Sequence, residues 1–134
     1  MSNAFYNVPI ATNEPVLAYA PGSVERQSVK NAIQTLKETR VDIPMFIGDK
    51  QVFTNDKKVI HPPHDHSHVL GTYSHGDASH VAMAIDAALN AKKSWEEMPW
   101  QERAAIFLKA ADLLSGPYRA KMNAATMLGQ SKNI

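Results

Sequence analysis

Hydrophobic residues recur at helical spacing through the last part of the chain, from Ser79 to Leu128. The first stripe comprises Val81, Ile85, Ala88, Lys92 and Trp95. Steps of three and four residues place side chains on one side of an α-helix. This spacing predicts a helix over residues 79–95, with Asp77 or Ser79 as its N-cap.

Two further helices are predicted after this one. Pro99 can open a helix over residues 99–115, because proline at the first helical position gives up an N–H that has no partner there. Its apolar face consists of Ile106, Phe107, Ala110, Leu113 and Leu114. A third helix over residues 117–128, ended by Gly129, places on one face Tyr118, Met122, Ala125 and Thr126 or Met127. We interpret all three stripes as core packing.

The chain before these helices divides into an arm, a helix and short strands. Residues 1–22 contain three prolines and little periodicity, which is typical of an extended arm. A helix over residues 24–39 is predicted by the N-cap candidate Ser23 and by a narrow apolar stripe. The stripe consists of Val29, Ala32, Ile33 and Leu36. We expect the segment from Val41 to Pro44 to end this helix.

Short β-branched and aromatic runs between residues 43 and 73 predict a small antiparallel ribbon. Met45–Ile47 and Gln51–Thr54 flank a glycine-containing turn, as in a β-hairpin. Val59–Ile60 and Val69–Tyr73 supply the other strands. A ribbon of this size needs support, and we expect the later helices to give it. The fold class is therefore α+β and mostly helical.

Four stretches follow one another along the chain: NEPVLAYAPGSVERQ, IPMFIGDKQV, HPPHDHSHVLGTY and FLKAADLLSGPYRAKMNAATMLGQSK. In this order they resemble one branch of the aldehyde dehydrogenase superfamily, the 1-pyrroline-5-carboxylate (glutamate γ-semialdehyde) dehydrogenases. The resemblance covers nearly the whole chain, from about Asn13 to Lys132. No single motif is diagnostic, but several in the right order are fairly specific.

The resemblance implies the N-terminal segment of an NAD-dependent enzyme that oxidises L-glutamate γ-semialdehyde to L-glutamate in proline catabolism. Residues 1–22 would form an arm, and residues 23–134 a truncated N-terminal portion of the NAD-binding domain. The Rossmann sheet and the catalytic domain would be lacking. The catalytic cysteine, the glutamate base and the NAD contacts would all lie beyond Ile134.

The absence of cysteine changes what this chain can do by itself. With Cys 0, the sequence has no disulfide, no thiolate metal ligand and no thiol nucleophile. The family attacks its substrate carbonyl with a cysteine thiolate. We therefore expect the chain alone to be inactive and assign it no catalytic and no cofactor-binding residues.

Composition excludes two classes of partner. A formal net charge of +1 gives no electrostatic case for nucleic acid or an anionic membrane. No apolar run reaches the roughly 18 residues of a membrane span. The first basic residue is Arg26, so we expect no signal or transit peptide and a cytoplasmic location.

A histidine-rich stretch is the most tempting candidate for chemistry. It contains His61, His64, Asp65, His66 and His68, with His75 and His80 nearby. If the chain is extended there, His64, His66 and His68 project to one side and could bind zinc, nickel or copper. The two prolines instead favour a turn with incidental histidines, so we assign no metal site.

Three other groups are weighed against structural alternatives. Glu96, Glu97, Glu102 and Arg103 could be acid–base groups, but they read better as solvated charges at helix ends. Trp95 and Trp100 could stack on a ligand, although the spacing of Trp95 favours a core position. The segment Gly129–Lys132 lacks the spacing of a Walker loop, so Gly129 is interpreted as a helix C-cap.

Three functions remain open at this point: the dehydrogenase segment, a stand-alone helical interaction module, and a histidine-based metal carrier. Exposed apolar surface distinguishes the first two, because a segment of a larger protein leaves its stripes uncovered. As partners we expect the missing remainder of the enzyme or a second copy of the chain. Self-association would use Ile106, Phe107, Ala110 and Leu113, with residues 1–22 crossing to the partner.

Overall fold

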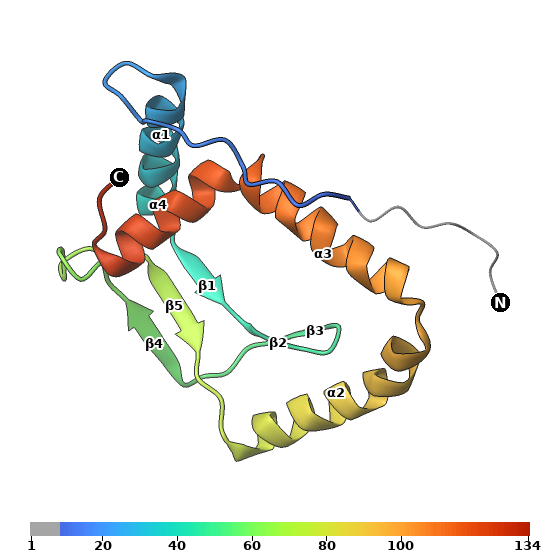
Figure 1. Ribbon diagram of the computed structural model, residues 1–134. Coiled ribbons are helices and arrows are strands. Elements are labelled where there is room, and N and C mark those ends of the chain that lie inside the picture. Colours follow the sequence, from blue (N-terminus) through green and yellow to red (C-terminus); the bar gives the residue numbers. More distant parts are fainter. Residues whose placement is uncertain (1–8) are drawn as a thin grey trace.

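The computed structural model describes residues 9–134 and contains, within that range, the helices that the periodicity predicts (Figure 1). They are α1 (Val24–Glu38), α2 (Ala78–Glu97), α3 (Trp100–Ser115) and α4 (Arg119–Gln130). The Ser23 hydroxyl accepts a hydrogen bond from the Arg26 N–H and caps α1 as predicted. Asp77 caps α2, and α3 ends at Ser115 with Gly116 as its C-cap.

The strands form two separate small sheets instead of one ribbon. They are β1 (Val41–Ile43), β2 (Met45–Ile47), β3 (Lys50–Val52), β4 (Lys57–Ile60) and β5 (Gly71–Ser74). The β2–β3 hairpin and the β4–β5 pair are antiparallel, which confirms the prediction for them. The prediction did not include β1, which lies in the segment expected only to end the first helix and which pairs in parallel with β5. After the β2–β3 hairpin and β4, the chain returns as β5, which runs beside β1 in the same direction. This pairing joins residues far apart in the sequence, so local periodicity does not reveal it.

Each face of the three-stranded sheet carries polar and apolar side chains, since Val59 pairs with Thr72 and Lys58 pairs with Tyr73. Alternation along the strands places Asp42 with Thr72 on one face, where the Asp42 carboxylate accepts hydrogen bonds from the Thr72 hydroxyl and the Lys57 ammonium. The hydrogen bond from Lys57 contributes most to keeping the pKa of Asp42 below its usual range. Ile43 and Tyr73 are paired on the other face and remain 41% and 42% exposed. This face therefore lacks a covering layer within the described residues.

Gly71 is required where β5 meets β1. A Cβ added at Gly71 would lie 2.2 Å from the Val41 carbonyl oxygen, which is backbone and cannot rotate away. We expect Gly71→Ala to lower the free energy of unfolding by about 1–3 kcal/mol, measured by urea titration of the helical circular dichroism. Gly129→Ala is the matched control, because a Cβ there meets nothing within 4 Å and α4 gains a better helix former. Equal midpoints for the two variants would contradict this role of Gly71.

The buried core lies between α1 and α4. Val29 of α1 is 1% exposed, and Ala124 and Leu128 of α4 are 0% and 5% exposed. The predicted face of α4 is therefore wrong: Tyr118 and Met122 are about half exposed. Ala124 and Leu128 are four residues apart and share a face, and the small alanine allows the two helices to approach closely.

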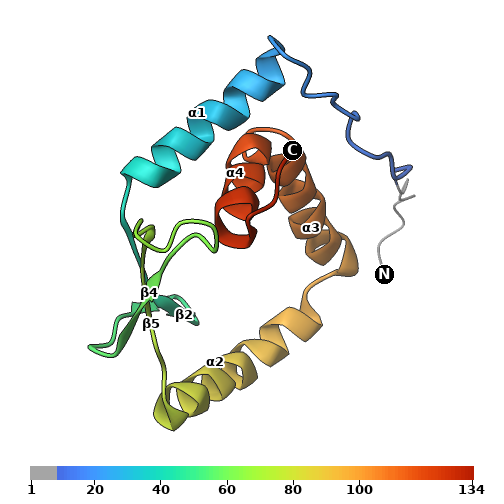
Figure 2. The same cartoon turned by 90° about the vertical axis from the view of Figure 1, so that its left-hand side faces the viewer.

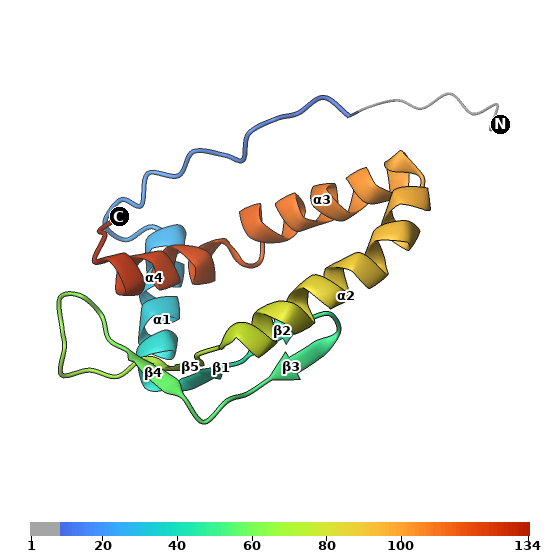
Figure 3. The ribbon, with the colours of Figure 1, turned by 90° about the horizontal axis from the view of Figure 1, so that it is seen from below.

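Helices α2 and α3 extend away from this core and contain no buried residue. From their joint near Pro99, α2 leads back to the strands and α3 leads to α4 (Figures 2 and 3). The predicted support of the ribbon includes α2 against β2, and a Cβ at Gly48 in the turn after β2 would lie 3.5 Å from the Ala87 side chain. The interpretation of the α2 and α3 stripes as core is wrong within this chain, since Val81 is 60% and Phe107 67% exposed.

The described part of the arm lies against α4 of its own chain. The Arg119 guanidinium donates to the Pro15 carbonyl oxygen at 2.9 Å, and the Asn123 amide donates to the Tyr19 hydroxyl at 2.9 Å. The Arg26 guanidinium donates to the Tyr19 carbonyl oxygen at 3.2 Å. Residues 15–19 therefore contact their own chain, and the crossing of residues 1–22 to a partner stays a prediction. Residues 1–8 lie outside the described part of the chain.

Candidate functional site

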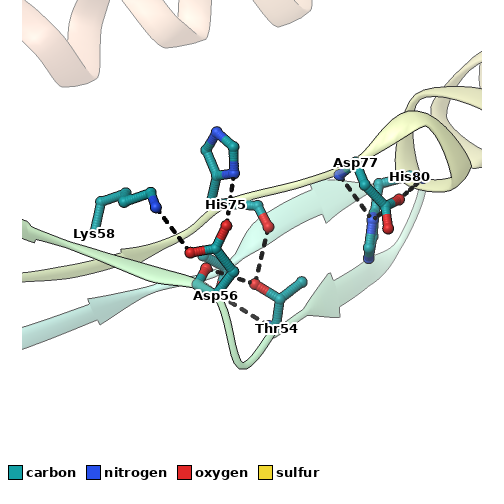
Figure 4. Close-up of polar contacts among 7 residues, drawn as sticks. Thr54, Asp56, Lys58, His75, Asp77 and His80 are labelled. Carbon is teal, nitrogen blue, oxygen red and sulfur yellow. Dashed lines mark hydrogen bonds and ion pairs between the residues drawn. The ribbon is translucent and has the colours of Figure 1, made fainter.

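Polar side chains gather where the strands lead into α2, and we call this group the strand–helix junction (Figure 4). It consists of Thr54, Asp56, Lys58, His75, Asp77, Ser79 and His80. The loop after β3, strand β4, the segment after β5 and the first turn of α2 supply these residues. Two imidazole–carboxylate pairs make it the strongest candidate for chemistry in residues 9–134.

Asp56 holds one half of the junction together. Its carboxylate lies 2.9 Å from the Lys58 ammonium and 3.0 Å from Nδ1 of His75. The Lys58 hydrogen bond is the first cause that lowers the pKa of Asp56, and His75 adds to it. The His75 N–H donates to the Asp56 carbonyl oxygen at 2.8 Å. The Thr54 hydroxyl lies within 3.0 Å of the carbonyl oxygens of both residues, so backbone and side chains fix this turn jointly.

Asp77 organises the other half as the N-cap of α2. Its Oδ1 accepts from the Ser79 hydroxyl at 2.6 Å and from the Ser79 N–H at 2.9 Å. Nδ1 of His80 lies 2.7 Å from the same oxygen and also faces the Asp77 N–H, which closes a capping box. The Ser79 and His80 hydrogen bonds hold the pKa of Asp77 well below its usual range.

The junction has the parts of an acid–base site but not its arrangement. The Ser79 hydroxyl donates to the Asp77 carboxylate and not to an imidazole, so no base activates it. Side-chain exposure is 53% for His75, 56% for Asp56 and 71% for Asp77, so solvent reaches the charged groups freely. Catalytic carboxylates need a desolvated cleft that separates their pKa values. The junction therefore acts structurally, by fixing where α2 leaves the strands.

The Asp77 cap predicts a pH dependence of stability. Because folding lowers the pKa of Asp77, its contribution is present above the ordinary carboxyl pKa and is lost as the pH falls through the lowered value. We expect Asp77→Ala to lower the urea midpoint at pH 7 and to have a smaller effect at pH 3, which lies between the ordinary and the lowered pKa of this carboxyl. Asp86→Ala, at an exposed position within α2, is the control and should shift the midpoint equally at both pH values. An Asp77→Ala effect that is the same at both pH values would contradict the role of the charged cap.

The histidine-rich stretch does not form a metal site among the described residues, where no group of three or more His, Cys, Asp or Glu is placed to hold an ion. The stretch turns twice, with the Asp65 N–H donating to the Pro62 carbonyl oxygen and the His68 N–H to the Asp65 carbonyl oxygen, which confirms the turn predicted from the two prolines. His64 contacts the Ser131 hydroxyl at 2.8 Å, and His61 contacts the His68 carbonyl oxygen at 2.8 Å. The imidazoles thus serve loop contacts with different partners.

The remaining candidates lie on helix ends. Glu96, Glu97 and Glu102 are exposed, as expected for solvated charges. Trp95 is 41% exposed, so its predicted core position is wrong here; the Arg103 guanidinium lies 6.0 Å from its ring centroid. Gly129 is not the C-cap of α4, because the helix continues to Gln130 and Ser131 adopts the left-handed conformation (φ 54°). The segment Gly129–Lys132 therefore spans a helix C-terminus, which cannot present N–H groups to a phosphate.

Hollows lie beside the arm, and two of them are described by their linings. One, of about 450 Å³, is lined by Tyr19, Val29, Asn123, Met127 and Lys132 among others. The other, of about 740 Å³, separates residues Pro9–Glu14 from the end of α3 and the start of α4. The Ser115 hydroxyl that lines the second hollow donates to the Ala111 carbonyl oxygen at 2.8 Å, so no base activates it.

Comparison with known proteins places the chain in a family. The model of the aldehyde dehydrogenase family matches residues 49–134. The chain belongs to the aldehyde dehydrogenase family. No helix in the described part of this aldehyde dehydrogenase chain is both long and apolar enough to cross a membrane.

The relatives are 1-pyrroline-5-carboxylate dehydrogenases. The chain is 47% identical to Delta-1-pyrroline-5-carboxylate dehydrogenase of Agaricus bisporus over 97% of its own length and 24% of that protein's. Identity to the human mitochondrial enzyme is 45%, over 91% of this chain and 22% of that protein. The crystal structure of the Mycobacterium tuberculosis enzyme bound with NAD superposes with a TM-score of 0.92 at 42% identity, covering 96% of this chain and 24% of that one. The chain thus spans about a quarter of the length of the relatives it matches.

Sequence reasoning found part of the strand–helix junction and missed the rest. It named Asp77 as a cap and noted His75 and His80, but it did not connect Thr54, Asp56 and Lys58 with them. The Asp77-x-x-His80 spacing, which matches the position of a capping-box partner, was the available signal. The contact of Asp56 with His75 joins residues 19 positions apart and depends on the sheet.

Proposed function

We propose that this chain is the N-terminal segment of an NAD-dependent dehydrogenase that oxidises L-glutamate γ-semialdehyde (1-pyrroline-5-carboxylate) to L-glutamate in proline catabolism. The observation that carries the proposal is the close match of 96% of the chain, with a TM-score of 0.92, to an enzyme of that name. The named relatives from a fungus and from human support the same substrate class.

In this proposal the chain supplies scaffold and no reacting group. Residues 1–22 form an arm, and residues 23–134 form the beginning of the NAD-binding domain. The described residues do not fit NAD by themselves, because Gly129–Lys132 ends a helix and presents no phosphate-binding N-terminus. The catalytic thiolate, the base and the NAD contacts then come from the part of the enzyme that corresponds to the other three quarters of the relatives.

The stand-alone interaction module is not favoured. A self-sufficient domain buries its apolar stripes, whereas Ile85, Trp95, Ile106 and Leu114 are each between 41% and 54% exposed. Both α2 and α3 lack any buried residue. These helices are the form expected for part of a larger fold whose covering layer comes from elsewhere in the protein.

A chimera tests the proposal directly. Replacing the matching N-terminal quarter of the Mycobacterium tuberculosis enzyme with this chain should give a protein that reduces NAD with 1-pyrroline-5-carboxylate. A second chimera carrying Phe107→Asp should lose most of this activity together with soluble protein, because a charge would then lie in an apolar interface. A soluble, folded first chimera without NADH production would contradict the proposed function.

The chain by itself should give no NADH signal with glutamate γ-semialdehyde, since it contains no thiol nucleophile and no dinucleotide fingerprint. A spectrophotometric assay of the purified chain, with contaminating host enzyme excluded by a mock purification, measures this. Turnover by the chain alone would contradict the assignment of catalysis to the rest of the enzyme.

We infer that its partners are the rest of the enzyme or, in isolation, a second copy, with no nucleic acid. A cytoplasmic location stays a prediction, because the named human relative is described as mitochondrial.

A further inference from the structure

Helix α3 carries large apolar side chains on more than one side. Ile106, Phe107 and Leu108 follow one another and are 51%, 67% and 51% exposed. Successive residues of an α-helix point about 100° apart, so Leu108 lies roughly 200° around the helix from Ile106. A single covering surface cannot bury both, and a helix that is apolar on opposite sides needs two covers.

The side that carries Leu108 faces the arm. Leu108, Ala111 and Leu114 of α3, together with Met122 of α4, line the 740 Å³ hollow whose other wall is residues Pro9–Glu14. Ile10 lies on that wall and is 90% exposed. Apolar groups of one chain thus face each other across a hollow, and water leaves such surfaces favourably when they meet.

The arm is anchored immediately beyond the hollow. Arg119 holds the Pro15 carbonyl oxygen, and Asn123 holds the Tyr19 hydroxyl, both at 2.9 Å. Arg119 and Asn123 also line the hollow, so the anchoring residues adjoin its open wall. An anchor at residues 15–19 restricts residues 9–14 to the neighbourhood of α3, which reduces the entropy lost when they close.

We propose that residues Pro9–Glu14 form a strap that closes onto α3, with Ile10 docking against Leu108, Ala111 and Leu114. Closure covers the Leu108 side of α3 with the chain's own arm. The Ile106 side then stays free for a second cover, which under the proposed function is the rest of the enzyme. The strap does not depend on the proposed function, so an experiment can contradict either proposal without contradicting the other.

Disulfide trapping tests the strap, because the chain contains no native cysteine to interfere. Ile10→Cys is combined with Ala111→Cys, and Val16→Cys with Ala111→Cys is the matched control. Val16 is 98% exposed and adjoins the anchored Pro15. Its side chain is therefore held near α3 but is not expected to dock against Leu108. Under mild oxidation at low micromolar concentration, we expect an intramolecular disulfide at least 10-fold faster in the Ile10 pair, since bonding needs Cα atoms within about 7 Å.

Mass spectrometry of the non-reduced protein distinguishes intramolecular from intermolecular bonds, and circular dichroism checks that both pairs keep their helices. Equal rates for the two pairs, or only intermolecular products from the Ile10 pair, would overturn the strap. If the double variants lose their helices, a second measurement decides. In this measurement a spin label is attached to Ala11→Cys. Its mobility should rise at least twofold when Leu108→Ser is added. Val81→Ser, the control, introduces the same polar side chain on α2 and should leave the mobility unchanged. Unchanged mobility with Leu108→Ser would refute closure.

Discussion

Replacing Leu128 with alanine is expected to lower the free energy of unfolding by about 2–5 kcal/mol. Leu128 is 5% exposed and packs with Ala124 and Val29 where α1 meets α4, the main buried cluster of the described residues. Losing the side chain removes its transfer free energy and leaves a cavity that the two helices cannot fully close. Urea titration followed by helical circular dichroism measures the change.

Leu89→Ala is the matched control for this substitution. Leu89 is 62% exposed on α2, so the same chemical change there removes little buried surface. Its effect should stay below about 0.5 kcal/mol, as is usual for exposed positions. If the two variants unfold at the same midpoint, the α1–α4 contact is not the core that stabilises this chain.

The second large effect is expected in the oligomeric state of the isolated chain. Light scattering should show self-association that increases over a concentration range reaching tens of micromolar. The reason is the apolar surface of α3, where Ile106 is 51% and Phe107 67% exposed, with Ala110 and Leu113 beside them. A few hundred Å² of such surface represents several kcal/mol at about 25 cal/mol per Å², which is comparable with a domain stability of roughly 5–15 kcal/mol.

A charge on this face should abolish the association. Phe107→Asp is expected to return the chain to its monomer mass, whereas Asn90→Asp adds the same charge at an exposed polar position and should leave the mass unchanged. A cooperatively folded monomer of the unaltered chain at tens of micromolar would contradict the prediction and would favour the stand-alone module. We expect a symmetric arrangement. The arm need not cross to a partner, because residues 15–19 are held within their own chain.

The sequence by itself determined the helices, most of the caps and the hairpin. Helical periodicity placed α1 to α4, and Ser23 and Asp77 were recognised as caps because a side chain that accepts from nearby N–H groups acts locally. The β2–β3 hairpin followed from its glycine turn for the same reason, since Gly48 adopts positive φ (61°) there. The order of the quoted stretches also determined the family, and the absence of cysteine showed that this chain contains no thiol nucleophile.

Only the tertiary structure decided which apolar stripes are covered. A stripe shows that a helix face is apolar, but burial depends on a partner far away in the chain or outside it. The stripe of α1 was read correctly at Val29, which packs on α4, whereas the equally regular stripes of α2 and α3 remain exposed. On α4 the contact with α1 selected Ala124 and Leu128 over the predicted Tyr118 and Met122. The parallel pairing of Val41 with Gly71 and the side-chain contact of Asp56 with His75 likewise join residues that local pattern cannot connect.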